Sequence, residues 1–223
     1  MIYSRPLLVF LLFSLTVLAA FPKFGDEFYQ ELVIHLMIMG IFAMSLDLLI
    51  GYTGLVSFGH AAFFGLSGYM LAIITPEVEP VSIWLALPFC LLVTSIAAFI
   101  IGWFSVRTSG IYFIMITLAF AQMLYYYFNE NQDLGGSDGV FIFYKPSIFV
   151  GNYQIIDLNN SDSFYYFVLI SLVISYLVLS MILKAPFGQV IKGIHANESR
   201  TRALGFNTQR YKLTSFVIAG TLA

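Results

Sequence analysis

Long uncharged apolar runs are the feature that most constrains this chain. The clearest covers residues 81–105, which contain no Asp, Glu, Lys or Arg. Overall, 60% of the residues are hydrophobic and 10% are charged, whereas a soluble domain has about 45–50% apolar and about 25% charged residues. Backbone groups in a bilayer must form internal hydrogen bonds, and these runs lack the alternation of barrel strands. We therefore expect an all-α, polytopic bundle of transmembrane helices.

We expect a single transmembrane domain over residues 1–223 with about seven spans, because about 20 apolar residues cross the hydrocarbon core as a helix. The expected spans are 6–22, 29–50, 56–75, 81–105, 110–128, 164–183 and 211–223. Two longer polar loops, 129–163 and 184–210, separate the later spans. The last run is shorter than a full span needs, so we expect the chain to be truncated at its C-terminus.

The basic residues predict the orientation of the spans. With a cytoplasmic N-terminus and alternating spans, eight of the ten Lys and Arg residues fall on the cytoplasmic side, and Lys23 and Lys145 fall outside. The positive-inside rule favours this arrangement over its reverse. The loop 129–163 is then extracytoplasmic, and the loop 184–210 is cytoplasmic.

A glycine-rich stretch, "LDLLIGYTGLVSFGHAAFFGLSGYM" (46–70), interrupts this pattern. The segment 51–54 is a tight connection in which glycine is free to take a positive φ. Beyond it, Ser57, Ala61 and Gly65 form a small-residue stripe at helical spacing. Such a stripe allows another helix to approach closely, or its pliable backbone lines a solute path as broken helices do in transporters. The sequence leaves both interpretations open.

Asp47 and His60 are an acid and a histidine in an otherwise mostly apolar stretch, and each has two possible explanations. Asp47 lies within an expected span, where an ionised acid costs about 2.5–3.5 kcal/mol at the bilayer centre. It is either an interfacial carboxylate with a water or backbone partner or a functional group. His60 is either a helix-to-helix hydrogen-bonding residue or a ligand.

Enzymatic activity has little support. The sequence "GLSG" at 65–68 matches the serine motif of rhomboid-type proteases, but His60 is seven residues from Ser67, a rise of about 10.5 Å along a helix. That distance is too long for a serine–base pair. The sequence contains no H-E-x-x-H, C-x-x-C or P-loop motif. We therefore expect no catalytic residue, no metal, no cofactor and no nucleic-acid partner.

The basic loop 184–210 contains an amphipathic helix. Pro186 is suited to the first helical position, and Phe187, Val190, Ile191 and Ile194 form an apolar stripe at helical spacing. A turn follows at Gly205. Such a helix either lies on anionic lipid or docks a cytoplasmic partner, and the pattern alone does not separate these.

Three stretches resemble the permease subunits of branched-chain amino acid ABC importers, of the LivM type. The first is the glycine-rich stretch quoted above. The second is "GIYFIMITLAFAQM" (110–123) together with "LGGSDGV" (134–140). The third is "APFGQVIKGIHANESRTRALGFNTQRYKLTSFVIAGTLA" (185–223). This chain has Asp47 where the family usually has Asn, and Gln189 and His195 where it usually has Arg.

The resemblance implies a permease in a bacterial or archaeal cytoplasmic membrane. It implies a second, homologous LivH-like permease subunit, two cytoplasmic ABC ATPase subunits that hydrolyse ATP, an extracytoplasmic solute-binding protein and contact with membrane lipid. The solute would be a branched-chain amino acid. A related urea or amide importer has similar motifs, and an ion-coupled secondary transporter using Asp47 and His60 is a further alternative.

The resemblance also assigns site residues to three groups. Coupling to the ATPase is expected of Phe187, Gly188, Ile194, Glu198, Leu204 and Gly205. The translocation path or its gating is expected to involve Asp47, Gly51, Gly54, Gly59, His60 and Thr117. Gly135, Gly136 and Asp138 either contact the binding protein or form a plain Gly/Asp turn, and the sequence leaves both open.

Overall fold

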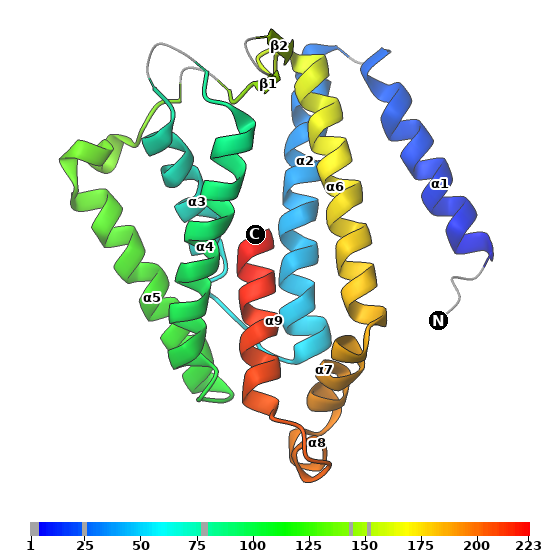
Figure 1. The fold of residues 1–223 in the computed structure, drawn as a ribbon, viewed down its shortest axis with the longest axis vertical. Coiled ribbons are helices and arrows are strands. Elements are labelled where there is room, and N and C mark those ends of the chain that lie inside the picture. The colour runs from blue at the N-terminus through cyan, green and yellow to red at the C-terminus, as the bar shows by residue number, and fades with distance from the viewer. Residues whose placement is uncertain (1–4, 24–25, 77–79, 143–144, 151–152) are drawn as a thin grey trace.

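The computed structural model describes residues 5–23, 26–76, 80–142, 145–150 and 153–223, which form a helical bundle (Figure 1). Its α-helices are α1 (Arg5–Ala20), α2 (Glu27–Asp47), α3 (Ala61–Ile74), α4 (Ile83–Ser105), α5 (Ile111–Glu130), α6 (Ser161–Lys184), α7 (Pro186–Ala196), α8 (Glu198–Ala203) and α9 (Thr208–Leu222). Short 3-10 turns cover Phe21–Lys23, Gln132–Leu134 and Gly136–Asp138. The expected all-α bundle is confirmed, with one small hairpin of β1 (Ile148–Val150) and β2 (Tyr153–Ile156) added.

Within the described residues, four helical segments are long and apolar enough to cross a membrane. They are Glu27–Thr53, Ile83–Ser105, Ile111–Glu130 and Ser161–Lys184. The helix expected over 56–75 begins only at Ala61, because the residues before it leave helical hydrogen bonding. Helix α3 is consequently short, and the count of seven spans stays a prediction.

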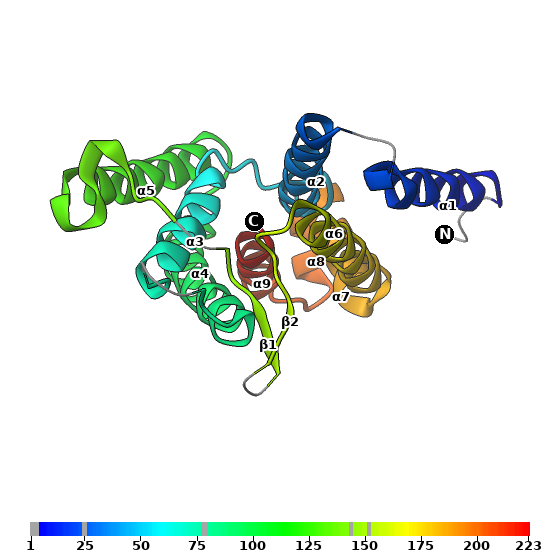
Figure 2. The same cartoon turned by 90° about the horizontal axis from the view of Figure 1, so that it is seen from above.

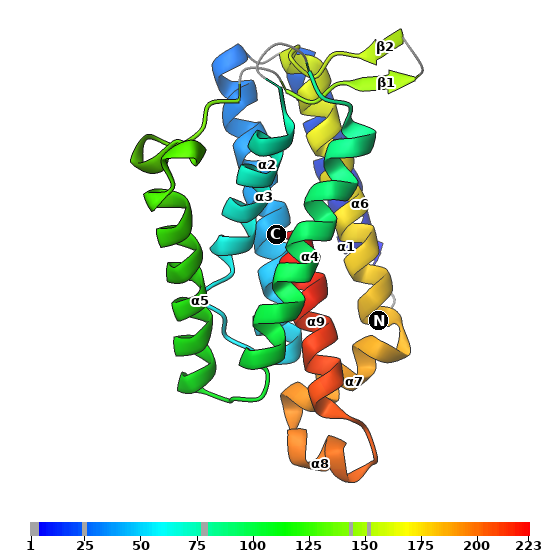
Figure 3. The ribbon, with the colours of Figure 1, turned by 60° about the vertical axis from the view of Figure 1, so that its left-hand side comes forward.

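The two polar loops lie at opposite ends of the bundle (Figures 1 and 3). The 129–163 segment contributes the 3-10 turns and the hairpin at one end. This end is tied to α4 by a bridge in which the Ser147 N–H donates to the Val81 carbonyl and the Ile83 N–H donates to the Ser147 carbonyl. The 184–210 segment folds as α7 and α8 at the other end.

Helix α9 occupies the middle of the bundle, with α3 and α4 on one side and α2 and α6 on the other (Figure 2). Its Phe216 is fully buried and packs edge-on against Phe63 of α3 and Phe113 of α5, with ring centroids 5.7 Å and 6.0 Å away. Gly102 of α4 allows this ring to approach, because a Cβ there would lie 2.8 Å from Phe216. The main core therefore forms around α9.

Helices α2 and α6 form a second buried cluster toward the hairpin end. It contains Ile34, Met37, Tyr165, Val168 and Leu169. The Tyr165 hydroxyl donates to the Leu18 carbonyl at 2.8 Å and so ties α1 to α6. Helices α1 and α5 lie at opposite edges of the bundle (Figure 2).

The small-residue stripe on α3 has no helix packed against it in the described part of the chain. A Cβ built at Gly65 or Gly68 would meet nothing within 4 Å. Ser57 precedes the helix rather than lying on it. Of the two interpretations of this stripe, close packing of another helix is therefore not made at Gly65 or Gly68 by the described residues, and both glycines face open space.

These packing differences predict unequal effects of the same substitution at two helical glycines. Gly102→Val would force its side chain against Phe216 and Leu213, and overpacking of this kind costs about 1–3 kcal/mol. Gly68→Val on α3 meets open space and is the matched control. Thermal unfolding in detergent should show a lower midpoint for Gly102→Val alone, and equal midpoints would contradict the described core.

Candidate functional site

The end of α2 is a turn of π-helix, Leu48–Thr53, followed by Gly54 in the left-handed region at φ 78°. The Thr53 hydroxyl donates to the Leu48 carbonyl at 2.8 Å. Its single proton is then used, so the Ser215 hydroxyl of α9 donates to Thr53 Oγ1 at 2.6 Å. Buried hydroxyls thus compensate for the interrupted helical hydrogen bonding and fix the turn to α9.

Helix α7 lies directly against this π turn. A Cβ at Gly54 would lie 2.8 Å from the ring of His195, and the Lys192 ammonium lies 5.4 Å from the centroid of the Tyr52 ring. Ile191 is fully buried in the core cluster that includes Leu48. The apolar stripe of α7 therefore faces the chain's own core, not a lipid surface.

After Gly54 the chain returns into the bundle as the non-helical segment Leu55–His60, and α3 begins there (Figure 1). A Cβ at Gly59 would overlap the carbonyl of Thr117 on α5. The Phe58 N–H donates to Thr117 Oγ1 at 3.4 Å. Two of the expected path residues, Gly59 and Thr117, are thus in direct contact and hold the segment against α5.

His60 is buried at the start of α3 and links it to α2. The Ser45 hydroxyl donates to the Phe42 carbonyl at 2.7 Å, so at 2.9 Å it accepts from the Nε2–H of His60. Among the described residues, His60 Nδ1 and the hydroxyl of Ser57 are buried without a hydrogen-bond partner. His60 therefore makes a helix-to-helix hydrogen bond with one nitrogen and leaves the other unused.

Asp47 and Gly51 lie apart from the contacts of Gly59, His60 and Thr117. Asp47 is exposed and lines a groove of about 340 Å³ between α2 and α6, together with Tyr52, Tyr176 and Ser180. A Cβ at Gly51 would overlap the Asp47 carboxylate. The six residues expected along a path are therefore not brought around one cavity.

Gly136 and Asp138 lie at the mouth of a larger groove between α3 and α5, with a volume of about 530 Å³. Gly135 has a φ of 80°, and the Gly139 carbonyl occupies the space of its missing side chain. The turn 135–139 is therefore a tightly folded rim at the hairpin end of the bundle.

In the loop 184–210, at the other end of the bundle, Glu198 contacts three other side chains, and we call this cluster the Glu198 hub. Its carboxylate accepts hydrogen bonds from Arg202 at 3.1 Å, from the Thr208 hydroxyl at 3.0 Å and from the buried Lys212 ammonium. Partial burial alone would raise the pKa of Glu198, but the hydrogen bonds from Lys212 and Thr208 and the nearby positive charges outweigh it and lower the pKa. The carboxylate is consequently ionised at neutral pH and fastens α8 to α9.

The other expected coupling residues divide between buried supports and an exposed tip. Phe187 stacks on Tyr211 of α9 with centroids 5.6 Å apart, Ile194 is buried, and a Cβ at Gly188 would overlap the carbonyls at the end of α6. Leu204 is 72% exposed and precedes Gly205, whose φ is 92°.

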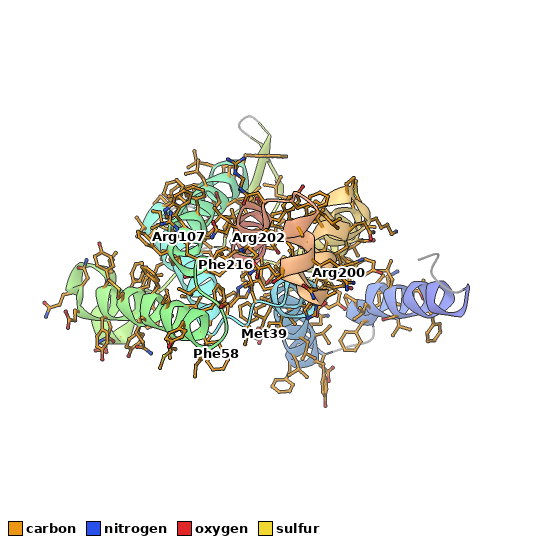
Figure 4. The ribbon with its side chains drawn as sticks, turned by 90° about the horizontal axis from the view of Figure 1, so that it is seen from below. Met39, Phe58, Arg107, Arg200, Arg202 and Phe216 are labelled. Carbon is orange, nitrogen blue, oxygen red and sulfur yellow. The ribbon has the colours of Figure 1, made fainter. Side chains whose placement is uncertain are left out.

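Viewed from the loop end, Arg107, Arg200 and Arg202 lie on this face of the bundle (Figure 4). Within the loop, the exposed Arg200 and Arg202 precede the exposed Leu204 and Phe206, which form an apolar tip. Within the described residues, no cluster of three or more His, Cys, Asp or Glu side chains could hold a metal ion.

Several residues of this site were not predicted. Ser45, Thr53, Tyr211, Lys212 and Ser215 hold the π turn, His60 and the loop in place. One signal for these residues was present in the sequence. Lys212 lies at the start of an apolar helix, and a lysine that is buried there needs a carboxylate partner. The hydroxyls gave none, because serine and threonine are common in membrane helices.

These features define a helical, multi-pass membrane protein with a broken helix in the bundle and a folded loop at one end. The family model described as "Branched-chain amino acid transport system / permease component" matches residues 28–223. The chain therefore belongs to this family of membrane transport components, as the three motifs predicted.

Two curated relatives are the high-affinity branched-chain amino acid transport system permease proteins LivM of Salmonella typhimurium (strain LT2) and Escherichia coli (strain K12). Each is 25% identical over 234 residues, an alignment that covers 96% of this chain and 55% of the relative. The chain thus spans about half the length of these relatives. No solved structure gave a significant match.

The Glu198 hub predicts a specific stability defect. Glu198→Gln leaves the buried Lys212 ammonium without its carboxylate, so the free energy of unfolding should fall by about 1–3 kcal/mol at pH 7. The double variant Glu198→Gln/Lys212→Met, which removes both charges, should recover part of this loss. Thermal unfolding in detergent measures both effects.

The same hub predicts how the defect depends on pH. The pKa of Glu198 is lower in the folded chain, so its stabilising effect is present above the ordinary carboxyl pKa of about 4.3 and is lost as the pH falls through the folded value. The stability difference between wild type and Glu198→Gln should shrink on acidification. A difference that stays constant from neutral to acid pH would contradict the assignment.

Proposed function

We propose that this chain is a membrane-spanning permease subunit of an ABC importer for branched-chain amino acids. It forms part of the translocation path and couples to separate ATPase subunits through the loop 184–210. The observation that carries this proposal is the folded loop, whose inner face is locked to the bundle while Leu204 and Phe206 face outward. ATP hydrolysis belongs to the partner subunits, since the sequence has no P-loop motif.

The contacts of the loop 184–210 would make it move as a rigid unit with the helices around it. Glu198 joins α8 to Lys212 of α9, and Phe187 joins α7 to Tyr211 of the same helix. Ile191 and His195 place α7 against the π turn that ends α2. A displacement of α7 and α8 by a partner would therefore reach α6, α9 and the broken segment before α3 together, as a rigid-body switch requires.

The exposed tip has the chemistry of a docking surface for a soluble subunit. Leu204 and Phe206 are apolar and exposed, and the exposed Arg200, Arg202 and Arg210 lie near them in the sequence. Aromatic and aliphatic anchors with a polar rim are typical of protein interfaces. An ATPase that contacts this tip would act directly on the Glu198 hub beneath it.

The charge distribution supports an orientation with the loop 184–210 and the N-terminus in the cytoplasm. Seven of the basic residues gather at the loop end, namely Arg107, Lys184, Lys192, Arg200, Arg202, Arg210 and Lys212. The rim 135–139 then faces the extracytoplasmic side, where a solute-binding protein would deliver the amino acid. A LivH-like second permease would complete the path in a bacterial or archaeal cytoplasmic membrane.

The partners can be identified directly. The tagged chain would be purified from gently solubilised native membranes, and the co-purifying proteins would be identified by mass spectrometry. A Walker-motif ATPase and a second permease are the expected partners. Recovery of neither with well-folded chain would contradict the proposal.

The tip makes a further prediction about the ATPase. Leu204→Asp replaces an exposed apolar anchor with a charge that no described contact of the folded chain opposes, so it should abolish ATPase co-purification without lowering the unfolding midpoint. Phe141→Asp is the matched control, because Phe141 is 78% exposed and lies between the Gly136–Asp138 turn and β1, away from the loop 184–210. It should retain the ATPase, and loss of the ATPase in both variants or in neither would contradict a docking role for the loop.

A further inference from the structure

A small pocket at the loop end of the bundle lies between the C-terminal end of α4 and the N-terminal end of α9. It has a volume of about 160 Å³, and its polar lining residues are Arg107, Asn207, Gln209 and Arg210. The fold thus brings two arginines that are far apart in the sequence to one pocket. Among the described residues that line it, none is an Asp or Glu.

Neither arginine of this pocket forms an ion pair with an acid of the described residues. Glu198, the one acid of the nearby loop, is engaged by Arg202 and Lys212. Arg107 instead places its guanidinium over the Trp103 ring, 4.7 Å from the ring centroid. Such a cation–π contact orients the side chain and leaves its positive charge in place. Both guanidinium groups are therefore available to an anion.

The start of α9 adds hydrogen-bond donors to the same pocket. Asn207 is the N-cap residue, and its side chain accepts a hydrogen bond from the Arg210 N–H. Gln209 lies in this first turn and lines the pocket. The first N–H groups of a helix have no partner within the helix, and the helix dipole gives this end a partial positive charge. Together with the two guanidinium groups, this end suits the oxygens of a phosphate group.

An exposed apolar stripe of α4 leads from the pocket along the bundle. Its members are each about half exposed, and they are Ile96, Phe99, Ile100 and Trp103. Their spacing of three or four residues places them on one helix face with Arg107. Helix α4 is long and apolar enough to cross a membrane, and a tryptophan at the end of an apolar stripe is typical of the membrane interface. The stripe therefore suits acyl chains, and the pocket at its end suits a headgroup.

We propose that this pocket binds the phosphate group of an anionic phospholipid, whose acyl chains lie along the α4 stripe. Basic pockets between membrane helices on the cytoplasmic side suit such headgroups, and arginine binds phosphate oxygens in a bidentate way. A zwitterionic phospholipid fits less well, because no carboxylate among the described lining residues receives its ammonium group. The inference goes beyond the proposed transport function and does not depend on which solute is carried.

The α4 stripe favours a lipid over an acidic surface of a soluble subunit as the occupant. A soluble subunit would approach from the aqueous side, where Leu204 and Phe206 are exposed. It would pair with the two arginines but leave the apolar stripe uncovered. An anionic phospholipid covers the stripe and pairs with the arginines at the same time.

Trp103 allows the site to be tested directly, because it lines the pocket and the chain has one other tryptophan, Trp84. The purified chain with Trp84→Phe would be reconstituted in phosphatidylcholine vesicles. Phosphatidylglycerol with brominated acyl chains, which quench tryptophan fluorescence on contact, would then be increased stepwise, with brominated phosphatidylcholine as the control lipid. Half-maximal quenching of Trp103 should need about tenfold less of the anionic lipid, because two arginines attract it.

Two double variants, each lacking two positive charges, form a matched pair. Arg107→Gln/Arg210→Gln should abolish the difference between the two brominated lipids. Lys192→Gln/Arg200→Gln removes the same charge from loop residues that do not line the pocket, and it should keep the difference. Thermal unfolding in detergent checks that both variants fold. The comparison of the two lipids with the parent chain needs neither variant, so it tests the proposal by itself.

The outcomes that would overturn the proposal are distinct. One is equal quenching of Trp103 by the two lipids in the parent chain. Another is a preference for phosphatidylglycerol that survives Arg107→Gln/Arg210→Gln or is lost in both double variants. A third is loss of the ATPase or the second permease on purification of Arg107→Gln/Arg210→Gln alone, because a protein surface would then fill the pocket. None of these outcomes changes the expected solute.

Discussion

The break between α2 and α3 is the constraint around which the rest of the structure is arranged. A chain that leaves helical hydrogen bonding in a buried part of the bundle must find other partners for its backbone groups, because an unpaired buried N–H or C=O group is costly. Thr53 supplies one, with Ser215 of α9 behind it, and Thr117 of α5 supplies another. Two further helices are thereby fixed to the broken segment.

The same break adjoins both the folded loop 184–210 and the groove between α3 and α5. On one side, Gly54 lies under His195 of α7, so the folded loop touches the π turn directly. On the other, the segment Leu55–His60 leads to the inner end of the groove between α3 and α5. A movement of the loop thus has a short physical route to the groove, through backbone that is already free of a helix.

The sequence predicted features that depend on local chemistry. The apolar runs predicted a helical membrane bundle, Pro186 predicted the start of α7, and the glycine-rich connection predicted a left-handed turn, found at Gly54. It did not predict that residues 55–60 are non-helical or that Gly65 faces open space. Those features depend on contacts such as Thr53 with Ser215, 162 residues apart, which no local pattern encodes.

The most direct test of the transport account is uptake by the purified complex in proteoliposomes, with the solute-binding protein added on the extracytoplasmic side. Labelled leucine, isoleucine and valine would be supplied there, and ATP or a non-hydrolysable analogue on the ATPase side. The account predicts uptake that requires ATP hydrolysis and competition among the three amino acids. Uptake driven by a proton gradient in the absence of ATP would contradict it, as would transport of a different solute with no uptake of these three.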